Sequence, residues 1–364
     1  MSMTVVALCL DGVDWNYLKA ADTPFIDALV REGVSTTAKA MIPSVTNINH
    51  ASILTASYPE RHGISGNTYY DRVRGLDIYM DDAVFLRCPT LLEEASRRGL
   101  RTLLLTVKDK LRRLLSRGVT HSYSVEKPSD EVVKALGRPP SIYTAEADLW
   151  LLRALRWEVE HHRWDLIYAS TTDYMLHKHD PGDDEVRDYL SAIDEELEAI
   201  YGLGVILGLT ADHGMRAKRV NLDPVKLLAE HGIEAHLTAA IRDEHYVHHM
   251  NLGGSAYLYL EDVEEARRIL SEAEGIELAL TRDEAAERFR LPRDRIGDLM
   301  LLAEEEYTLG LNPSSPYRDV ELRSHGSLHE ADVPLILSLD RQLRGVVENR
   351  LLLPLLGFRA DAPR

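Results

Sequence analysis

The sequence has little cysteine, no excess of positive charge and no hydrophobic run long enough to cross a membrane. Only Cys9 and Cys88 occur among 364 residues, which excludes a disulfide-stapled scaffold. Because Cys9 lies inside an apolar run, we interpret it as a buried, reduced thiol. Arginine and lysine number 42 against 59 aspartates and glutamates, and the formal charge of −17 disfavours binding to nucleic acid. An anionic substrate would therefore need a strong local positive centre.

The N-terminal segment, MSMTVVALCLDG, has no basic region ahead of its short apolar stretch. We interpret this stretch as a first strand, and we expect a soluble, cytoplasmic protein with no membrane partner. With 364 residues and 45% hydrophobic composition, the chain can bury one large α/β domain and a smaller second one. The oligomeric state cannot be read from the sequence, and a homodimer is one open alternative.

Short apolar runs alternate with helical patterns over most of the chain. The runs predict buried strands at 4–10, 102–106, 165–170, 204–210 and 333–339. The patterns between them predict helices at 16–31, 90–98, 144–162 and 185–201. Strands and helices that alternate in this way predict an α/β fold, with a mostly parallel central sheet covered on both faces.

The alternation breaks between residues 215 and 319. This stretch offers strands near 233–242, 255–260, 276–281 and 298–303, and a helix at 263–274. We interpret residues 215–319 as a smaller α+β cap domain. It would be inserted into a catalytic core made of residues 1–214 and 320–364.

Polar side chains directly follow the apolar runs. In α/β sheets, ligands bind beyond the carboxyl ends of the strands, so these positions are the first candidates for a functional site. They are Asp11, Lys108 with Lys110, Asp173, and Asp212 with His213. Four strand ends thus bring carboxylate, imidazole and ammonium groups to one edge of one sheet.

Two pairs of residues suit a metal ion. Asp212 and His213 stand side by side at a strand end, before a glycine that lets the backbone turn. Asp173 and His177 are four residues apart, so both side chains share one face if the chain turns helical there. Carboxylate oxygen and imidazole nitrogen are typical zinc ligands. The alternative for Asp173 and His177 is a solvated surface turn.

Three further residues complete the candidate set. His325 lies in SHG shortly before the last strand, where a structural or exposed histidine is the alternative and His329 competes for the role. Asp11 is either a ligand pointing into the cleft or a turn aspartate. Thr46 leads into a predicted helix, as either an N-cap or a hydroxyl placed where the helix dipole favours an oxyanion. Together the candidates would serve two cations, which can clamp an in-line displacement at phosphorus.

At these residues the sequence resembles the alkaline phosphatase superfamily. The resemblance is to its nucleotide pyrophosphatase/phosphodiesterase branch, and within that branch to the phosphonoacetate hydrolase family. The shared segments run in order through most of the chain: DGVD, PSVTNINHASILTA, YPERHGISGN, TVKDKLRRLL, STTDYMLHKHDPG, TADHGM and LRSHGSLHE. The resemblance implies an alkaline-phosphatase-like three-layer sandwich.

The resemblance also implies an activity. It implies that two zinc ions support hydrolysis of the C–P bond of phosphonoacetate, giving acetate and phosphate through a phosphothreonine intermediate. Two alternatives stay open. One is a promiscuous phosphodiesterase or nucleotide pyrophosphatase of the same superfamily, and the other is a non-catalytic protein that binds a metal or a phosphonate.

Carried over by position, the family pattern implies two metal sites. One has the ligands Asp173, His177 and His325, and the other has Asp11, Thr46, Asp212 and His213. Thr46 would also be the nucleophile, and Asn67 matches an asparagine that holds the phosphoryl oxygens. Mn²⁺ or Fe²⁺ could substitute for Zn²⁺, because all three metals accept nitrogen and oxygen ligands.

Lys108 and Lys110 match the pair that separates the phosphonoacetate hydrolase family from its phosphodiesterase relatives. If they extend the preceding strand, residues two apart point the same way. Both ammonium groups could then hold the substrate carboxylate and the charge that develops as the C–P bond breaks. The alternative is the basic start of a helix, since LRRLL follows.

Ile48 and His50 depart from the family pattern, which tends to have proline and asparagine at these positions. In the cap, His245, His248 and His249 either face the site or face solvent.

Overall fold

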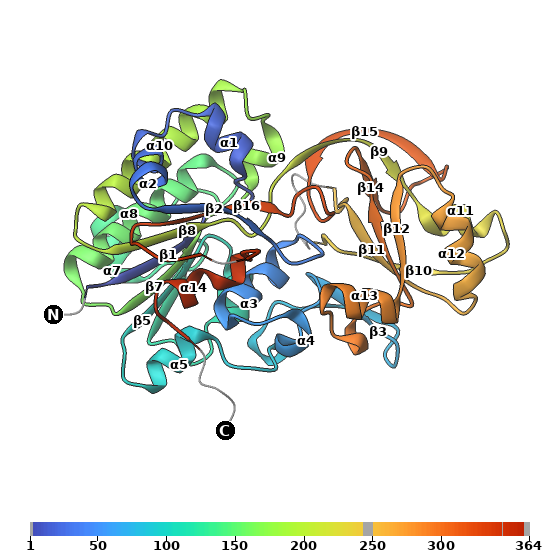
Figure 1. Cartoon of the computed structure of the whole chain (residues 1–364), viewed down its shortest axis with the longest axis horizontal. Coiled ribbons are helices and arrows are strands. Elements are labelled where there is room, and N and C mark those ends of the chain that lie inside the picture. Colours follow the sequence, from blue (N-terminus) through green and yellow to red (C-terminus); the bar gives the residue numbers. More distant parts are fainter. Residues whose placement is uncertain (1–2, 243–249, 344, 360–364) are drawn as a thin grey trace.

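A seven-stranded sheet forms the centre of the computed structural model, which describes residues 3–242, 250–343 and 345–359 (Figure 1). In spatial order its strands are β2 (Val34–Lys39), β16 (Asp332–Leu337), β8 (Ile206–Thr210), β1 (Val5–Cys9), β7 (Leu166–Ser170), β5 (Thr102–Thr106) and β6 (His121–Ser124). The five strands from β8 to β6 are parallel, and β16 is antiparallel to both of its neighbours. The predicted, mostly parallel sheet is confirmed.

Helices cover both faces of this sheet, because alternate residues of a buried strand point to opposite sides. Val6 and Leu8 of β1 pack into one hydrophobic cluster and Ala7 and Cys9 into another. The first cluster lies under α1 (Trp15–Ala20), α2 (Pro24–Glu32), α7 (Asp130–Leu136), α8 (Ala145–His161) and α10 (Asp184–Tyr201). The second lies under α3 (Thr46–Thr55), α5 (Leu91–Arg97), α6 (Asp109–Leu115) and α14 (Leu352–Leu355) (Figure 1). These are the three layers that the resemblance implied.

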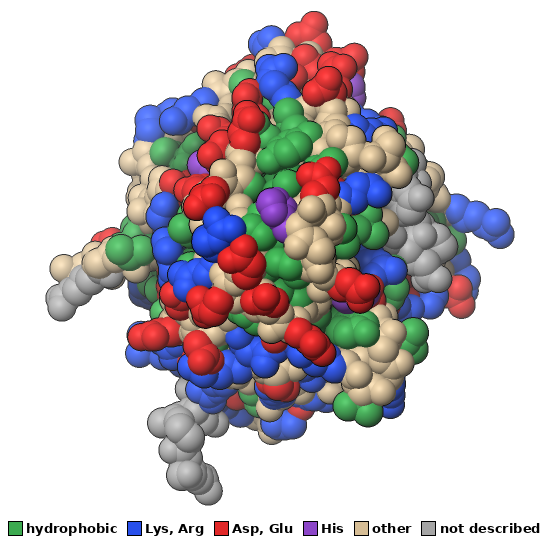
Figure 2. All heavy atoms as spheres, turned by 90° about the vertical axis from the view of Figure 1, so that its right-hand side faces the viewer, with side chains coloured by type: hydrophobic (Ala, Val, Ile, Leu, Met, Phe, Trp, Pro, Cys, Tyr) green, Lys and Arg blue, Asp and Glu red, His purple; other side chains and the backbone are tan. Residues whose placement is uncertain are grey.

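Residues 216–324 build a second group of sheets at the right of Figure 1. One sheet has the order β10 (His236–Ala239), β11 (Ser255–Tyr259), β13 (Leu299–Ala303) and β12 (Ile276–Thr281). Beside it lie β14 (Tyr307–Leu309), β9 (Arg216–Leu222) and β15 (Tyr317–Ser324), with helices α11 (Pro224–Ala229), α12 (Val263–Ser271) and α13 (Arg282–Phe289). Figure 2 views this end of the molecule, where acidic and basic side chains are interspersed. The division into a core and a cap of residues 215–319 stays a prediction, and β15 runs across its second boundary.

The remaining elements are short. They are α4 (Pro59–His62), α9 (Tyr174–Lys178), the hairpin of β3 (Thr68–Asp71) and β4 (Leu76–Tyr79), and three 3₁₀ turns at Ala83–Phe85, Arg293–Arg295 and Asn349–Leu351. In the part of the chain that the structure describes, no helix combines the length and the apolar character needed to cross a membrane.

One predicted helix was wrong. The expected helix at 16–31 is two helices, α1 and α2, which are separated around Thr23 and Pro24. Proline cannot donate a backbone hydrogen bond, and it restrains the residue before it to extended conformations, so the first helix ends and a second begins at Pro24. The edge strands β2 and β6 were not predicted, since VSTTAK and HSYS lack a continuous apolar run.

Candidate active site

Four neighbouring strands deliver the candidate side chains to one edge of the central sheet. The order β8, β1, β7, β5 places the residues that follow each strand next to one another. Asp212 and His213 follow β8, Asp11 follows β1, Asp173 follows β7 after two threonines, and Lys108 follows β5. The carboxylates and imidazoles among them are buried, with exposed fractions of 2% or less. The sheet order therefore explains why residues far apart in the sequence meet here.

Helix α3 carries Thr46 at its N-terminal end. The N-cap residue of α3 is Val45, and Thr46 is the first helical residue, so the N-cap alternative for Thr46 was wrong by one position. Every residue of α3 is buried, and Thr46 keeps 8% of its surface exposed. The backbone N–H of Asn47 donates to Oδ1 of Asn67 over 3.2 Å, which fixes Asn67 beside the start of the helix.

Two groups of side chains could each hold a metal ion. Asp11, Asp212 and His213 form one group, and Asp173, His213 and His325 form the other. Within each group the ligand atoms lie within 4.8 Å of one another, and all five residues are buried. His213 belongs to both groups, so the two candidate metal positions are adjacent.

The first group contains polar atoms that have no hydrogen-bond partner among the described residues. They are Oδ1 of Asp11, Oδ2 of Asp212 and Nε2 of His213. Nε2 of His213 lies 3.5 Å from Oδ1 of Asp11 and 3.2 Å from Oδ2 of Asp212. A buried polar atom without a partner costs about 1–3 kcal/mol, and a cation shared by the three atoms would remove that cost. The donor set fits a divalent metal.

The crowding of carboxylates also favours a bound cation. Burial first, and then the charges of Asp212 and Asp173, raise the pKa of Asp11 well above its ordinary value. A bound divalent cation would compensate this negative charge and favour the ionised carboxyl group.

The three candidate histidines are oriented by backbone carbonyl groups. Nδ1 of His177 lies 2.6 Å from the carbonyl oxygen of Arg323, and Nδ1 of His325 lies 2.8 Å from that of Ser44. Nδ1 of His213 lies 3.0 Å from the carbonyl oxygen of Gly214. A carbonyl can only accept, so each Nδ1 carries the proton and each Nε2 presents a lone pair. This is the arrangement that metal-binding histidines adopt.

Helix α9 brings Asp173 and His177 together, as their spacing of four predicted. Nε2 of His177 lies 2.9 Å from Oδ2 of Asp173, and Nε2 of His325 lies 3.6 Å from the same oxygen. With Nδ1 of His177 committed to a carbonyl, two lone pairs would face each other across the 2.9 Å contact. A shared cation would relieve that repulsion.

The two lysines lie differently from the expected extended segment. Lys108 is the N-cap residue of α6 and Lys110 lies in its first turn, so the alternative of a basic helix start is the observed structure. Even so, both lysines line one cavity of about 330 Å³. Asn47, Asn67 and Tyr143 line it as well. Nζ of Lys108 lies 3.3 Å from Oδ1 of Asp173, so the cavity adjoins the candidate metal ligands.

The other predicted histidines fall away from the site or outside the described residues. His329 lies at the surface, where its Nε2 is 2.8 Å from Oε2 of Glu277, and it does not compete with His325. His245, His248 and His249 lie outside the residues that the structure describes.

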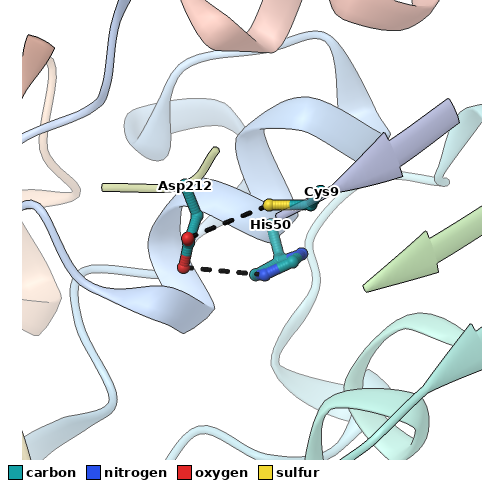
Figure 3. Close-up of side chains that lie close together, drawn as sticks. All are labelled: Cys9, His50 and Asp212. Carbon is teal, nitrogen blue, oxygen red and sulfur yellow. Dashed lines mark hydrogen bonds and ion pairs between the residues drawn. The ribbon is translucent and has the colours of Figure 1, made fainter. Parts of the chain in front are cut away.

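Sequence reasoning missed a buried cluster that includes Asp212. It consists of Cys9, His50 and Asp212, none of which has an exposed surface (Figure 3). Cys9 is a free, buried cysteine, as predicted. Burial lowers the pKa of His50 to about 4. The signal in the sequence was the spacing of four between Thr46 and His50, which places both on one face of α3.

Comparisons with known proteins agree with this geometry. The family model of type I phosphodiesterase/nucleotide pyrophosphatase matches residues 5–328. The crystal structure of phosphonoacetate hydrolase from Sinorhizobium meliloti 1021 in complex with phosphonoformate is 34% identical and has a TM-score of 0.89. The alignment covers 96% of this chain and 94% of that one. The same hydrolase in complex with phosphonoacetate gives 33% identity and the same TM-score of 0.89.

More distant relatives share less. Human ectonucleotide pyrophosphatase/phosphodiesterase 5 has a TM-score of 0.70 at 18% identity, over 97% of this chain and 93% of that one, which shows a common fold. Human ectonucleotide pyrophosphatase/phosphodiesterase family member 7 is 37% identical over 70 residues. That match spans 18% of this chain and only 15% of the relative's length.

Proposed function

The chain belongs to the type I phosphodiesterase/nucleotide pyrophosphatase family, and from this premise we propose that it is a two-zinc hydrolase that cleaves the C–P bond of phosphonoacetate. The products would be acetate and phosphate. The observation that carries the proposal is the buried set of carboxylates and imidazoles beside a cavity lined by two lysines. The similarity to phosphonoacetate hydrolase along 96% of the chain supports it.

We propose that Asp173, His177 and His325 hold one metal ion and that Asp11, Thr46, Asp212 and His213 hold the other, with His213 also close to Asp173 and His325. The unpartnered atoms of Asp11, Asp212 and His213 support this assignment, as do the Nε2 lone pairs of the three histidines. When bound, two zinc ions would act as Lewis acids that lower the pKa of a bound hydroxyl group or water. Mn²⁺ and Fe²⁺ are the substitutes to test.

In the proposed reaction, the Thr46 oxygen attacks phosphorus and the C–P bond breaks. The Thr46 hydroxyl loses its proton, and the bonding electrons move to the departing carbon, which takes up one proton to give acetate, so the step is balanced. Water then cleaves the phosphothreonine and releases phosphate. Asn67, held by the backbone N–H of Asn47, is placed to orient the phosphoryl oxygens.

A carbanion is a poor leaving group, so the developing charge needs stabilisation. Lys108 and Lys110 line the cavity next to the ligand groups, where their ammonium groups can hold the substrate carboxylate and this charge. The cavity also has the cations Arg113 and Lys127, which pair with Asp81 and Asp109. Five basic side chains and three acidic ones line the cavity, and this local excess of positive charge supports an anionic substrate in a protein of net charge −17.

A phosphodiesterase is the second candidate, favoured by the family match itself. In that case the lysines would bind a distal phosphate group. A zinc-reconstituted sample, assayed with phosphonoacetate and with an aryl phosphodiester, separates the two candidates. We expect phosphate release from phosphonoacetate. Robust diester turnover without any phosphate from phosphonoacetate would favour the diesterase.

Substitution of the lysines sharpens this test. We expect Lys108→Ala and Lys110→Ala to lower kcat/KM for phosphonoacetate far more than for the diester. Lys127→Ala is the matched control, because Lys127 lines the same cavity but its Nζ lies 2.9 Å from Oδ2 of Asp109. Equal losses for both substrates in the Lys108 and Lys110 variants would count against a role in holding the carboxylate.

A non-catalytic binding protein is the remaining alternative. Metal analysis together with a Thr46→Ala variant distinguishes it from an enzyme. About two zinc ions per chain and loss of turnover in Thr46→Ala support catalysis. Tight binding of phosphonoacetate without any turnover by the unchanged protein supports a binding role.

A further inference from the structure

The cluster of Cys9, His50 and Asp212 contains one proposed metal ligand, Asp212 (Figure 3). Cys9 ends β1, His50 belongs to α3, and Asp212 follows β8. All three side chains are fully buried, with no exposed surface. The cluster therefore joins the central sheet to the helix that carries Thr46.

The two oxygens of Asp212 have different surroundings. Oδ1 accepts a hydrogen bond from the backbone N–H of Gly12 over 3.2 Å and lies 3.8 Å from Sγ of Cys9. Oδ2 lies 3.2 Å from Nε2 of His213 on the metal side and 3.6 Å from Nε2 of His50 on the other. Oδ2 is thus the oxygen offered to the metal, and His50 is the ring behind it.

The groups around the ring determine which nitrogen of His50 carries the proton, because the Tyr168 hydroxyl can either donate or accept. The Tyr168 hydroxyl lies 2.7 Å from Nδ1 of His50, and Oγ of Ser170 lies 3.4 Å from Nε2. A lone pair on Nε2 would point at the carboxylate of Asp212, and the two would repel. The favourable tautomer has the Tyr168 hydroxyl donating to Nδ1, with the Nε2–H directed towards Ser170 and Asp212.

Helix α3 makes this contact relevant to the nucleophile. Thr46 and His50 are four residues apart on α3, so they lie on one face in successive turns. A contact that holds His50 against Asp212 therefore also restrains the Thr46 turn of α3 relative to this proposed metal ligand.

We propose that His50 is a positioning residue that orients Oδ2 of Asp212 towards the metal and aligns the Thr46 turn of α3 with it. The inference rests on the proposed metal centre. In metal sites, groups that support a ligand typically change metal affinity or activity by about 10- to 100-fold when removed. His50 should therefore act on one of the two metal sites and not on the other.

The test is zinc affinity, measured by competition with a chromophoric chelator, for the full-length protein and its variants. We expect His50→Ala to weaken one of two zinc sites by about 10- to 100-fold and to leave the other unchanged. His50→Gln restores an N–H donor at a similar reach and should recover most of the affinity. Tyr168→Phe keeps the ring but removes the hydroxyl donor, so it should give a smaller loss at the same site, and it serves if His50→Ala does not fold.

His62→Ala is the matched control for His50→Ala. His62 is also a fully buried histidine that contacts α3, with Nε2 2.8 Å from Oγ of Ser52, but it has no contact with Asp212. We expect this variant to lower thermal stability without changing zinc affinity. Equal effects of His62→Ala and His50→Ala on zinc affinity would mean that His50 acts only through packing, and would overturn the proposal.

Two further outcomes would overturn the inference while leaving the proposed function intact. One is unchanged affinity at both zinc sites in a folded His50→Ala variant. The other is a third zinc equivalent that disappears in His50→Ala, which would make Cys9, His50 and Asp212 a ligand set. By contrast, if the unchanged protein binds no zinc, the proposed function fails first and the inference fails with it.

Discussion

Asp148 shows how a single buried carboxyl group supports the candidate site from outside it. Its Oδ1 accepts a hydrogen bond from the backbone N–H of Thr172 over 2.7 Å, next to the proposed ligand Asp173. Its Oδ2 accepts one from the Tyr189 hydroxyl over 2.9 Å. Burial raises the pKa of Asp148 to about 8, so the folded protein holds this group protonated at neutral pH.

This gives a pH prediction for Asp148→Asn. An aspartate has a pKa of about 3.9 in the unfolded chain, so the stability that the protonated group contributes is lost as pH rises from about 4 to about 8. The asparagine variant mimics the protonated group and escapes that loss. Relative to wild type, we expect Asp148→Asn to gain up to about 1.4 kcal/mol of unfolding free energy per pH unit in this range. Urea unfolding at pH 6 and pH 8 measures it, and a difference that does not change with pH would contradict the prediction.

At the residue scale, the sequence predicted the candidate ligands that follow strands better than the groups that orient those ligands. Asp11, Asp173, Asp212 and His213 stand at strand ends, and sheet order alone brings them together. The partners that orient them cannot be read in the same way. Ser44, for example, accepts from His325 across 281 positions of sequence, and only the folded chain makes such a contact.

At the scale of elements, a buried ion pair joins β9 to the loop that carries His325. Nζ of Lys218 lies 2.8 Å from Oε1 of Glu330, and neither side chain is exposed. Oε2 of Glu330 accepts from the backbone N–H and the hydroxyl of Ser327, and its carbonyl accepts from the backbone N–H of Gly214. The pair therefore ties together the loops that present His213 and His325.

We expect Lys218→Met to cost about 3–5 kcal/mol of unfolding free energy, because it leaves the Glu330 carboxylate buried without its partner. The double variant Lys218→Met/Glu330→Gln should recover part of this loss. Urea unfolding at pH 7 makes the comparison. A single variant as stable as wild type would mean that water or another group replaces the lysine.

The same pair has a pH signature. Burial alone would raise the pKa of Glu330, but the Lys218 ammonium and the Ser327 hydrogen bonds outweigh it and hold the pKa below its ordinary value. The stability it contributes is thus present above the unfolded value of about 4.3 and is lost as pH falls through the folded pKa. The difference between wild type and Lys218→Met should therefore shrink below about pH 4.

Helices and strands were predictable where their burial produces a recognisable apolar pattern in the sequence. The strands at 102–106 and 166–170 are continuous apolar runs and were predicted to within one residue. The strand β9 reads RAKRVNL, and β15 reads YRDVELRS, so neither shows such a run. Their pairing with each other, rather than their own composition, makes them strands.

At the scale of the whole molecule, the proposed metal ions should stabilise the fold. Binding to the folded state alone contributes about 4 kcal/mol when free metal is a thousandfold above its Kd. We expect a chelator to lower the thermal unfolding midpoint by several degrees, and added Zn²⁺ to restore it. Equal midpoints with and without chelator would mean that the unpartnered atoms of Asp11, Asp212 and His213 do not hold a metal.

The overall architecture was the most predictable level, because alternating strands and helices allow few arrangements. The cytoplasmic location, the oligomeric state and the division at residues 215–319 stay predictions. They depend on surfaces and partners that apolar periodicity does not encode.

The place of the second group of sheets in the chain affects how the protein is made. Asp212 and His213 come just before the residues that build it, and His325 comes just after them. A ribosome therefore releases every other candidate ligand long before it releases His325. Throughout that interval the nascent chain holds an incomplete donor set. The proposed metal centre can be completed only after synthesis has passed His325.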